Sequence, residues 1–227
     1  MKKLFSIILT LTLFLSSSIT ICAAERQTVT PPQDELISFE TLQALFPDVS
    51  LNKNGYVDDY NNNSATFFTQ KAADFLSNPV ETHTAEYNGG ICNLNVYANG
   101  AYGAYGFEKI SSDVTPYDAG YNITGSTYRA YYTMMASQGF SYTFTVSSGS
   151  GYSTISQLSG VSTQYGIPQS YFSARSSQYI RAKQTSASAP AQVCGDAEYY
   201  HIGYSNGTFR LYSTANSGKV SVSYTVL

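Results

Sequence analysis

The amino-acid sequence predicts a mainly β protein, in which an antiparallel β-sandwich follows a short N-terminal segment with two helices. From about residue 81 onward, apolar and polar residues alternate with a period of two, and turn signals recur between these runs. The composition agrees, because Tyr (21), Phe (12) and Gly (17) are plentiful, Trp is absent and only 12% of residues are charged. The lack of interleaved helices favours a sandwich over an α/β plan. Whether its topology is immunoglobulin-like or jelly-roll-like stays open.

The first 24 residues are typical of a secretory signal peptide. Lys2 and Lys3 precede an apolar run over 4–15, and small residues end at Ala24, just before the polar Glu25. We expect cleavage near Ala24–Glu25 and a secreted protein, either extracellular or at the cell-envelope surface. Because a membrane-spanning helix needs about 20 apolar residues, no transmembrane segment is expected in the mature chain.

Charge and cysteine content restrict the partners and the redox state. Cleavage would remove Lys2 and Lys3 and leave 10 basic and 15 acidic residues, a net charge of −5. This balance argues against nucleic acid or anionic lipid as a partner. Two cysteines remain, Cys92 and Cys194, and an even pair in an exported chain predicts a disulfide. The bond would stabilise the fold by about 4–5 kcal/mol through restriction of the unfolded chain. Two free thiols are the alternative.

The segment 25–80 is expected to hold two short helices before the β domain of 81–227. The first runs from Glu35 to Phe46 and ends before Pro47, and the second runs from Ser64 to Leu76, each with apolar residues at helical spacing. Between them, the loop Ser50–Asn61 resembles a degraded calcium loop. It lacks carboxylates at its first and last ligand positions, so an Asn/Gly turn is favoured over a calcium site.

Three strands are expected at 81–88, 91–98 and 101–108, joined by two-residue turns at Gly89-Gly90 and Asn99-Gly100. Pairing across these turns assigns each side chain to a face. The predicted core face holds Ala85, Tyr87, Cys92, Leu94, Val96, Tyr105 and Phe107. The opposite face holds Thr84, Glu86, Asn93, Asn95, Tyr97 and Tyr102.

Two further hairpins follow. One joins 127–135 to 140–147, with Phe140, Tyr142, Phe144 and Val146 on its core face, and the Ser/Gly-rich stretch 148–170 is either a long loop or an edge strand. The other turns at Asn206-Gly207, so that Tyr204 faces Phe209, and a following turn at Ser217-Gly218 pairs the last strand back onto it. Around Arg175, Arg181 and Lys183 we expect a solvated edge strand.

Candidate catalytic patterns are few. Gly203–Gly207 fits the G-x-S-x-G of hydrolases, but a strand follows it and no His lies beyond His201, so a hairpin turn is the better interpretation. A metal site needs three or four convergent ligands, and the sequence places no such set around His83 or His201. No metal and no cofactor are therefore expected. Asp196 and Glu198 are the carboxylates of most interest for a hydrolase. Their parity places them with Tyr200 on the predicted core face, unless Gly195 forms a bulge that turns them outward.

Tyrosines on the predicted outer faces suggest a binding surface, because a tyrosine ring is apolar while its hydroxyl still forms hydrogen bonds. The expected ligand-binding residues are Tyr97, Tyr102, Tyr131, Tyr199, His201, Arg210 and Tyr212.

From these observations we expect a secreted, non-enzymatic binding domain for an extracellular glycan or protein. Two alternatives remain. One is a membrane-active, pore-forming β protein in which the stretch 148–166 refolds into an amphipathic hairpin. The other is an extracellular hydrolase with a carboxylate pair. The sequence indicates neither the ligand nor the oligomeric state.

Overall fold

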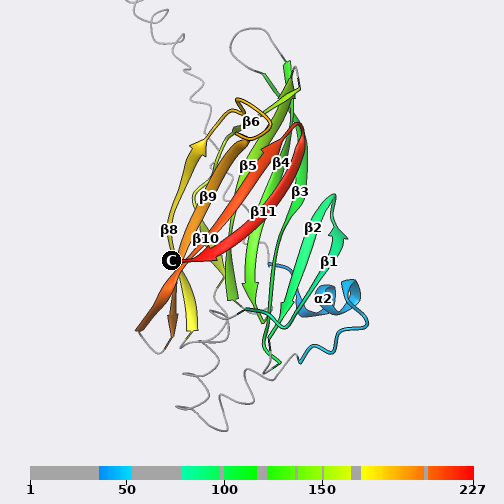
Figure 1. Ribbon diagram of the computed structural model, residues 1–227, viewed down its shortest axis with the longest axis vertical. Helices are drawn as coiled ribbons and strands as arrows, with labels where there is room; N and C mark the ends of the chain where they lie inside the picture. The colour runs from blue at the N-terminus through cyan, green and yellow to red at the C-terminus, as the bar shows by residue number, and fades with distance from the viewer. Residues whose placement is uncertain are drawn as a thin grey trace, which may run out of the picture. The chain divides into compact units, whose positions relative to one another are not determined.

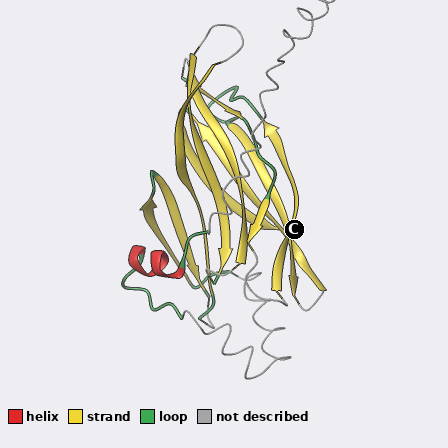
Figure 2. Cartoon of the chain, turned by 180° about the vertical axis from the view of Figure 1, so that it is seen from behind, coloured by secondary structure: helices red, strands yellow, loops and turns green. Residues whose placement is uncertain are grey.

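The computed structural model describes residues 36–52, 78–97, 100–116, 122–135, 138–149, 151–164, 170–201 and 204–227. Within them the chain is mainly β, with antiparallel strands in two sheets and one short helix (Figures 1 and 2). The predicted signal peptide, the predicted helix Ser64–Leu76 and residues 53–61 of the calcium-like loop lie outside the described residues. No helix in the described ranges has the length and apolarity to cross a membrane.

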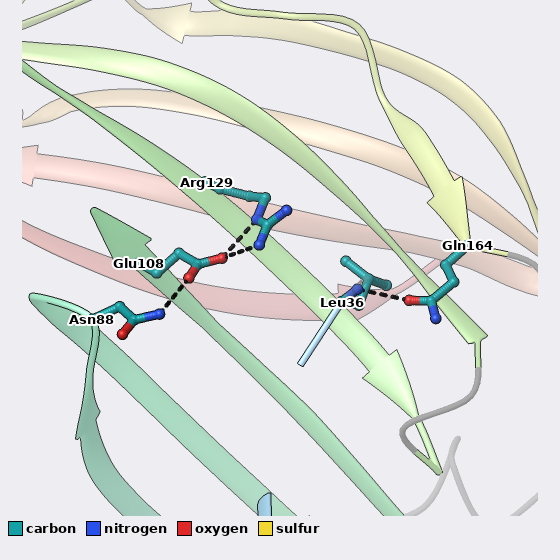
Figure 3. Close-up of polar contacts among 5 residues, drawn as sticks. All are labelled: Leu36, Asn88, Glu108, Arg129 and Gln164. Carbon is teal, nitrogen blue, oxygen red and sulfur yellow. Dashed lines mark hydrogen bonds and ion pairs between the residues drawn. The ribbon is translucent and has the colours of Figure 1, made fainter. Parts of the chain in front are cut away.

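Helix α2 (Phe39–Leu45) begins later than the predicted Glu35. Ser38 has extended backbone (φ −75°, ψ 162°), and its hydroxyl accepts a hydrogen bond from the Thr41 N–H, so it caps the helix at that point. Leu42 is buried, as are the flanking Leu36 and Phe46. The segment before the helix is hydrogen-bonded to strand β7 (Ser162–Gln164), because the Leu36 N–H donates to Gln164 Oε1 at 2.9 Å (Figure 3).

Sheet A contains seven strands in the order β1-β2-β3-β4-β5-β6, with β7 also paired to β5. From β1 to β6, consecutive strands pair antiparallel, as a meander predicts. The strands are β1 (Glu81–Tyr87), β2 (Gly90–Val96), β3 (Tyr102–Pro116), β4 (Asn122–Met134), β5 (Gln138–Gly149), β6 (Tyr152–Ser156) and β7 (Ser162–Gln164).

Sheet B contains four antiparallel strands in the order β11-β10-β9-β8. These are β8 (Ser170–Arg181), β9 (Ala191–His201), β10 (Tyr204–Asn216) and β11 (Lys219–Val226). Aromatic rings join the two sheets into one buried core. The Tyr132 ring of sheet A lies 5.1 Å from the Phe209 ring and 4.9 Å from the Tyr224 ring of sheet B, centroid to centroid. Such tilted aromatic packing contributes beyond simple area burial.

Several predicted pairings are confirmed. Ser217 and Gly218 form the β10–β11 turn with φ of +50° and +81°, and Phe209 pairs with Val226 as expected. The hairpin of β4 and β5 is also present, although its turn precedes Gln138, which pairs with Met134. The stretch 148–170, left open between loop and strand, contributes β6 and β7, both paired to β5.

The predicted register of β3 is wrong by one residue. The Tyr97 N–H bonds to the Ala101 carbonyl, and this closes a loop of three residues rather than two. Tyr102 therefore pairs with Val96, and Ala104 with Leu94. Because side chains alternate, the slip exchanges the faces of the whole strand. Tyr102, Ala104 and Gly106, rather than Tyr105 and Phe107, lie beside Leu94 and Cys92. The β1–β2 turn also lies one residue earlier than predicted, at Asn88-Gly89, but this change keeps the faces.

The predicted turn at Asn206-Gly207 is wrong. Strand β10 runs through this dipeptide, and His201 already pairs with Tyr204. A register shift between Ser205 and Thr208 makes the site a β-bulge, for which the φ of +119° at Gly207 is suitable. Phe209 consequently pairs with Ala197 of β9 instead of facing Tyr204.

The predicted disulfide is absent, and Cys92 and Cys194 are both buried free thiols. Tyr132 faces sheet B, so its neighbour Tyr131 and the Cys92 row of sheet A face away from sheet B. Cys194 alternates with the core residue Val193, so it faces away from sheet A. Both sheets therefore separate the two sulfur atoms. We call these two surfaces the far face of sheet A and the outer face of sheet B.

Candidate functional site

The outer face of sheet B brings together four of the candidate residues that the sequence indicates, namely Asp196, Glu198, Arg210 and Tyr212. Strand alternation sends Val193, Ala197 and Tyr199 of β9 into the core. The residues between them point outward, next to outward-facing partners from β10 and β8. This set consists of Cys194, Asp196, Glu198 and Tyr200 from β9, Arg210 and Tyr212 from β10, and Tyr171 and Gln178 from β8.

Asp196 and Arg210 form a bidentate ion pair across β9 and β10, where they are direct cross-strand partners. Arg210 Nε donates to Asp196 Oδ1 at 2.8 Å, and Nη2 donates to Oδ2 at 2.7 Å. These hydrogen bonds to Asp196 raise the pKa of the guanidinium above its ordinary value. Asp196 is only 7% exposed, whereas the Arg210 side chain is 26% exposed. The arginine thus covers the acid and keeps the fork geometry that favours carboxylate binding.

Glu198 has an equivalent partner from the other neighbouring strand. Arg175 forms an ion pair with Glu198 and lies at the register shift between Ala174 and Ser176 in β8. The extra residue of this bulge re-aims the arginine toward the acid. The Arg175 side chain is 54% exposed, so this pair is open to solvent on the arginine side.

Cys194 lies on the same face, next to the polar side chain of Gln178. Gln178 Nε2 approaches its Sγ at 3.6 Å, and burial raises the pKa of the thiol. At one end of the face, the rings of Tyr171 and Tyr200 stack with centroids 5.2 Å apart and planes 12° apart. Both tyrosines are partly exposed, so this pair is an aromatic surface beside the Arg175–Glu198 ion pair.

The structure corrects the placement of four predicted binding residues. Tyr97, Tyr102, Tyr131 and Tyr199 were expected on outer faces, but each is at most 2% exposed. The slipped register buries Tyr102, and the bulged β10 reverses the faces assigned to β9, which buries Tyr199. Arg210 and Tyr212 do lie on the outer face, partly exposed. For His201 the described structure extends only to its backbone pairing with Tyr204 and Ser170.

Asp196 and Glu198 also differ from expectation. They share a face with Tyr200 as predicted, but this face is the outer one, and β9 shows no register shift at Gly195. Tyr171, Tyr200 and Arg175 were not among the predicted site residues, and Arg210 was predicted without its partner Asp196. Correct parity for β9 places Tyr200 on the outer face, but it does not indicate which residues of β8 lie opposite.

A second polar cluster lies on the far face of sheet A (Figure 3). Arg129 Nε donates to Glu108 Oε1 at 2.6 Å, and Asn88 Nδ2 donates to Oε2 at 2.9 Å. Glu108 is 5% exposed, so its charge is compensated almost entirely by these protein groups. Burial also raises the pKa of the nearby Cys92 thiol to about 11.

His83 lies on the same face as Cys92. It pairs with Leu94 of β2, and its Nε2 is 3.1 Å from Glu81 Oε2. Across the described ranges, no three His, Cys, Asp or Glu side chains converge as a metal site would require.

The arrangement on sheet B is better suited to recognition than to acid–base chemistry. A glycosidase needs one carboxyl group that can give a proton and a second that can attack or activate water. Here Asp196 and Glu198 are each occupied by a guanidinium. The tyrosine pair and the ion pairs instead offer apolar ring surface and oriented donors and acceptors side by side.

Comparisons with known proteins give little further information. No family model matches the chain, and no curated protein matches it. Among solved structures it is similar to the crystal structure of a hypothetical protein from Listeria monocytogenes EGD-e. The two are 15% identical with a TM-score of 0.32, over 60% of this chain and 93% of that chain.

Proposed function

We propose that the chain is an exported, non-enzymatic binding domain, built as an antiparallel β-sandwich, that binds an extracellular glycan through the outer face of sheet B. The observation that carries the proposal is the combination on this face of the Tyr171–Tyr200 stack with two carboxylate–guanidinium pairs. Tyrosine rings supply apolar surface for the C–H faces of a sugar, while charged and amide groups bind its hydroxyls. The signal-peptide pattern of the first 24 residues supports export.

The proposal is tested by probing an array of bacterial and host glycans with the purified mature protein. Tyr171→Ala and Tyr200→Ala are expected to weaken binding at least tenfold, because each removes part of the ring surface. Tyr152→Ala is the matched control, since Tyr152 is 46% exposed but belongs to β6 of sheet A. Equal binding by Tyr200→Ala and wild type, or no glycan bound at all, would contradict the proposal. A protein ligand would then become the better hypothesis.

The hydrolase and pore-forming alternatives have direct assays. Release of sugar or peptide products by the mature protein, abolished by Asp196→Asn or Glu198→Gln, would establish the enzyme instead. Dye release from liposomes at micromolar protein would establish the membrane-active function. In the described structure β6 and β7 pair with β5, so refolding of 148–166 has to break those pairings first.

A further inference from the structure

The free edge of β11 has a backbone pattern that is open to another strand. Thr208 and Leu227 exchange both backbone hydrogen bonds, Thr208 N–H to Leu227 O at 3.5 Å and Leu227 N–H to Thr208 O at 2.9 Å. Hydrogen-bonded pairs alternate along an antiparallel ladder. Lys219, Ser221, Ser223 and Thr225 therefore bond to β10, and the N–H and C=O groups of Val220, Val222, Tyr224 and Val226 point to the other side. In the described part of the chain no strand pairs with that side.

The other two long edges have charged residues or register shifts that disfavour pairing with a further strand, and the edge of β11 lacks these features. β1 carries Glu81, His83 and Glu86. β8 contains two register shifts and ends with Arg181. By contrast, β11 pairs with β10 over eight consecutive residues without a shift, and its single charged residue, Lys219, is at its first position. A regular, uncharged edge is the kind that accepts an added strand.

Sheet A provides a floor beneath this edge. β11 contacts β3, and the sheet continues beyond β3 as β2 and then β1, as Figure 1 shows. At about 4.8 Å per strand, the continuation extends about 10 Å past β3. Asn95 of β2 donates to the Tyr224 hydroxyl of β11, which fixes the side of β2 that faces sheet B. On that same side of β1, Thr82, Thr84 and Glu86 are exposed, so sheet B does not cover them.

We propose that the free edge of β11 binds an extended polypeptide segment of another protein as an additional strand of sheet B. Backbone groups of Val220, Val222 and Tyr224 supply the hydrogen bonds, as in other cases of β-strand addition. The floor selects small or hydroxylated side chains on the inward positions of the segment. It consists of Thr–Asn pairs, with Thr82 Oγ1 donating to Asn95 Oδ1 at 3.0 Å and Thr84 Oγ1 donating to Asn93 Oδ1 at 2.9 Å.

A second copy of the chain fits this edge poorly. If two β11 strands paired antiparallel in one continuous sheet, the β1–β2 hairpins of both copies would extend under the same junction and collide. A single strand has no such overhang. This site is separate from the outer face of sheet B, so either proposal can fail without the other.

The test uses the mature protein and a synthetic peptide with the sequence of residues 219–227, in which Ser221, Ser223 and Thr225 share one face and supply the hydroxylated inward positions that the floor selects. Amide hydrogen exchange is measured with and without the peptide. The edge-facing amides of Val220, Val222, Tyr224 and Val226 are expected to exchange rapidly alone and at least tenfold more slowly with saturating peptide. The amides of Ser221, Ser223 and Thr225 are expected to be protected in both cases.

Val222→Pro supplies the genetic control, because it removes one edge-facing N–H and leaves every bond to β10. It is expected to weaken peptide binding at least tenfold relative to Val222→Ala, which loses similar packing but keeps the N–H. Thermal unfolding of the two variants shows whether both are folded, and the exchange experiment on wild type stands if Val222→Pro is not. Unchanged edge amides at millimolar peptide would overturn the proposal. So would a peptide-free dimer in which these amides are already protected.

Discussion

The far face of sheet A and the outer face of sheet B carry the same set of groups at different depths. Each has a cross-strand carboxylate–guanidinium pair and a buried free thiol. On the far face the Arg129 side chain is 16% exposed, whereas on the outer face Arg210 is 26% and Arg175 is 54% exposed. The acids are similarly buried in all three pairs. The three pairs therefore differ in the solvent access of the arginine rather than in that of the acid, and under the proposed function the two more exposed guanidinium groups are those that a ligand reaches.

The largest effect is expected for Arg129→Leu. The substitution leaves the Glu108 carboxylate buried with only Asn88 among its described partners, and loss of one member of a buried pair typically costs about 3–5 kcal/mol. Urea denaturation measures the change in the free energy of unfolding. The double variant Arg129→Leu/Glu108→Leu is expected to recover most of the loss, because the uncompensated charge is gone. A double variant as unstable as the single one would show that packing, not charge, sets the cost.

Arg210→Leu is expected to have a smaller effect, of about 1–3 kcal/mol. It removes two charge-assisted hydrogen bonds from Asp196, but this acid lies on a solvent-facing surface that water can reach once the guanidinium is absent. The same urea titration provides the measurement. A loss as large as that of Arg129→Leu would remove the distinction between the two faces.

The thiol of the far face predicts a pH effect. Burial raises the pKa of Cys92 from 9.0 to about 11 in the folded protein, so its contribution to stability is complete below pH 9 and is lost as the pH rises toward 11. Between pH 8 and 10 this loss amounts to about 1 kcal/mol. Cys92→Ala should therefore show a shallower decline of stability over this range than wild type. Parallel curves for the two proteins would contradict the assigned burial of this thiol.

The same regions show which parts of the structure were predictable from sequence. The β10–β11 hairpin was predicted in register, because strict alternation and a two-residue turn determine it locally. Asn206-Gly207 has the stronger turn signal of the two dipeptides, yet it forms a bulge. Pairing of Phe209 and Leu211 with β9 outweighs the local preference, and a single sequence does not display such non-local pairing.

The candidate site was predicted less well than the fold, because the site depends on which face of its strand each side chain occupies. One extra residue in the loop from Tyr97 to Ala101 buried Tyr102. The cross-strand partners of Asp196 and Glu198 come from strands whose register depends on bulges in β8 and β10. The acids themselves were recognised from their positions in the sequence. Their arginines were not assigned to them, because no periodicity within one strand indicates which residue of the next strand lies opposite.

The smallest effect is expected for Arg175→Ala, and it separates stability from binding most cleanly. With more than half of the arginine side chain exposed, water replaces much of what the guanidinium gives Glu198, and exposed pairs contribute about 1 kcal/mol or less. The free energy of unfolding should therefore change little. Binding of any glycan that depends on Tyr200 should nevertheless fall several-fold, because Arg175 and Glu198 lie beside the Tyr171–Tyr200 stack. A variant that loses stability but keeps full glycan binding would make this pair structural, like that of Arg129, and would leave the tyrosine stack without its polar neighbour in recognition.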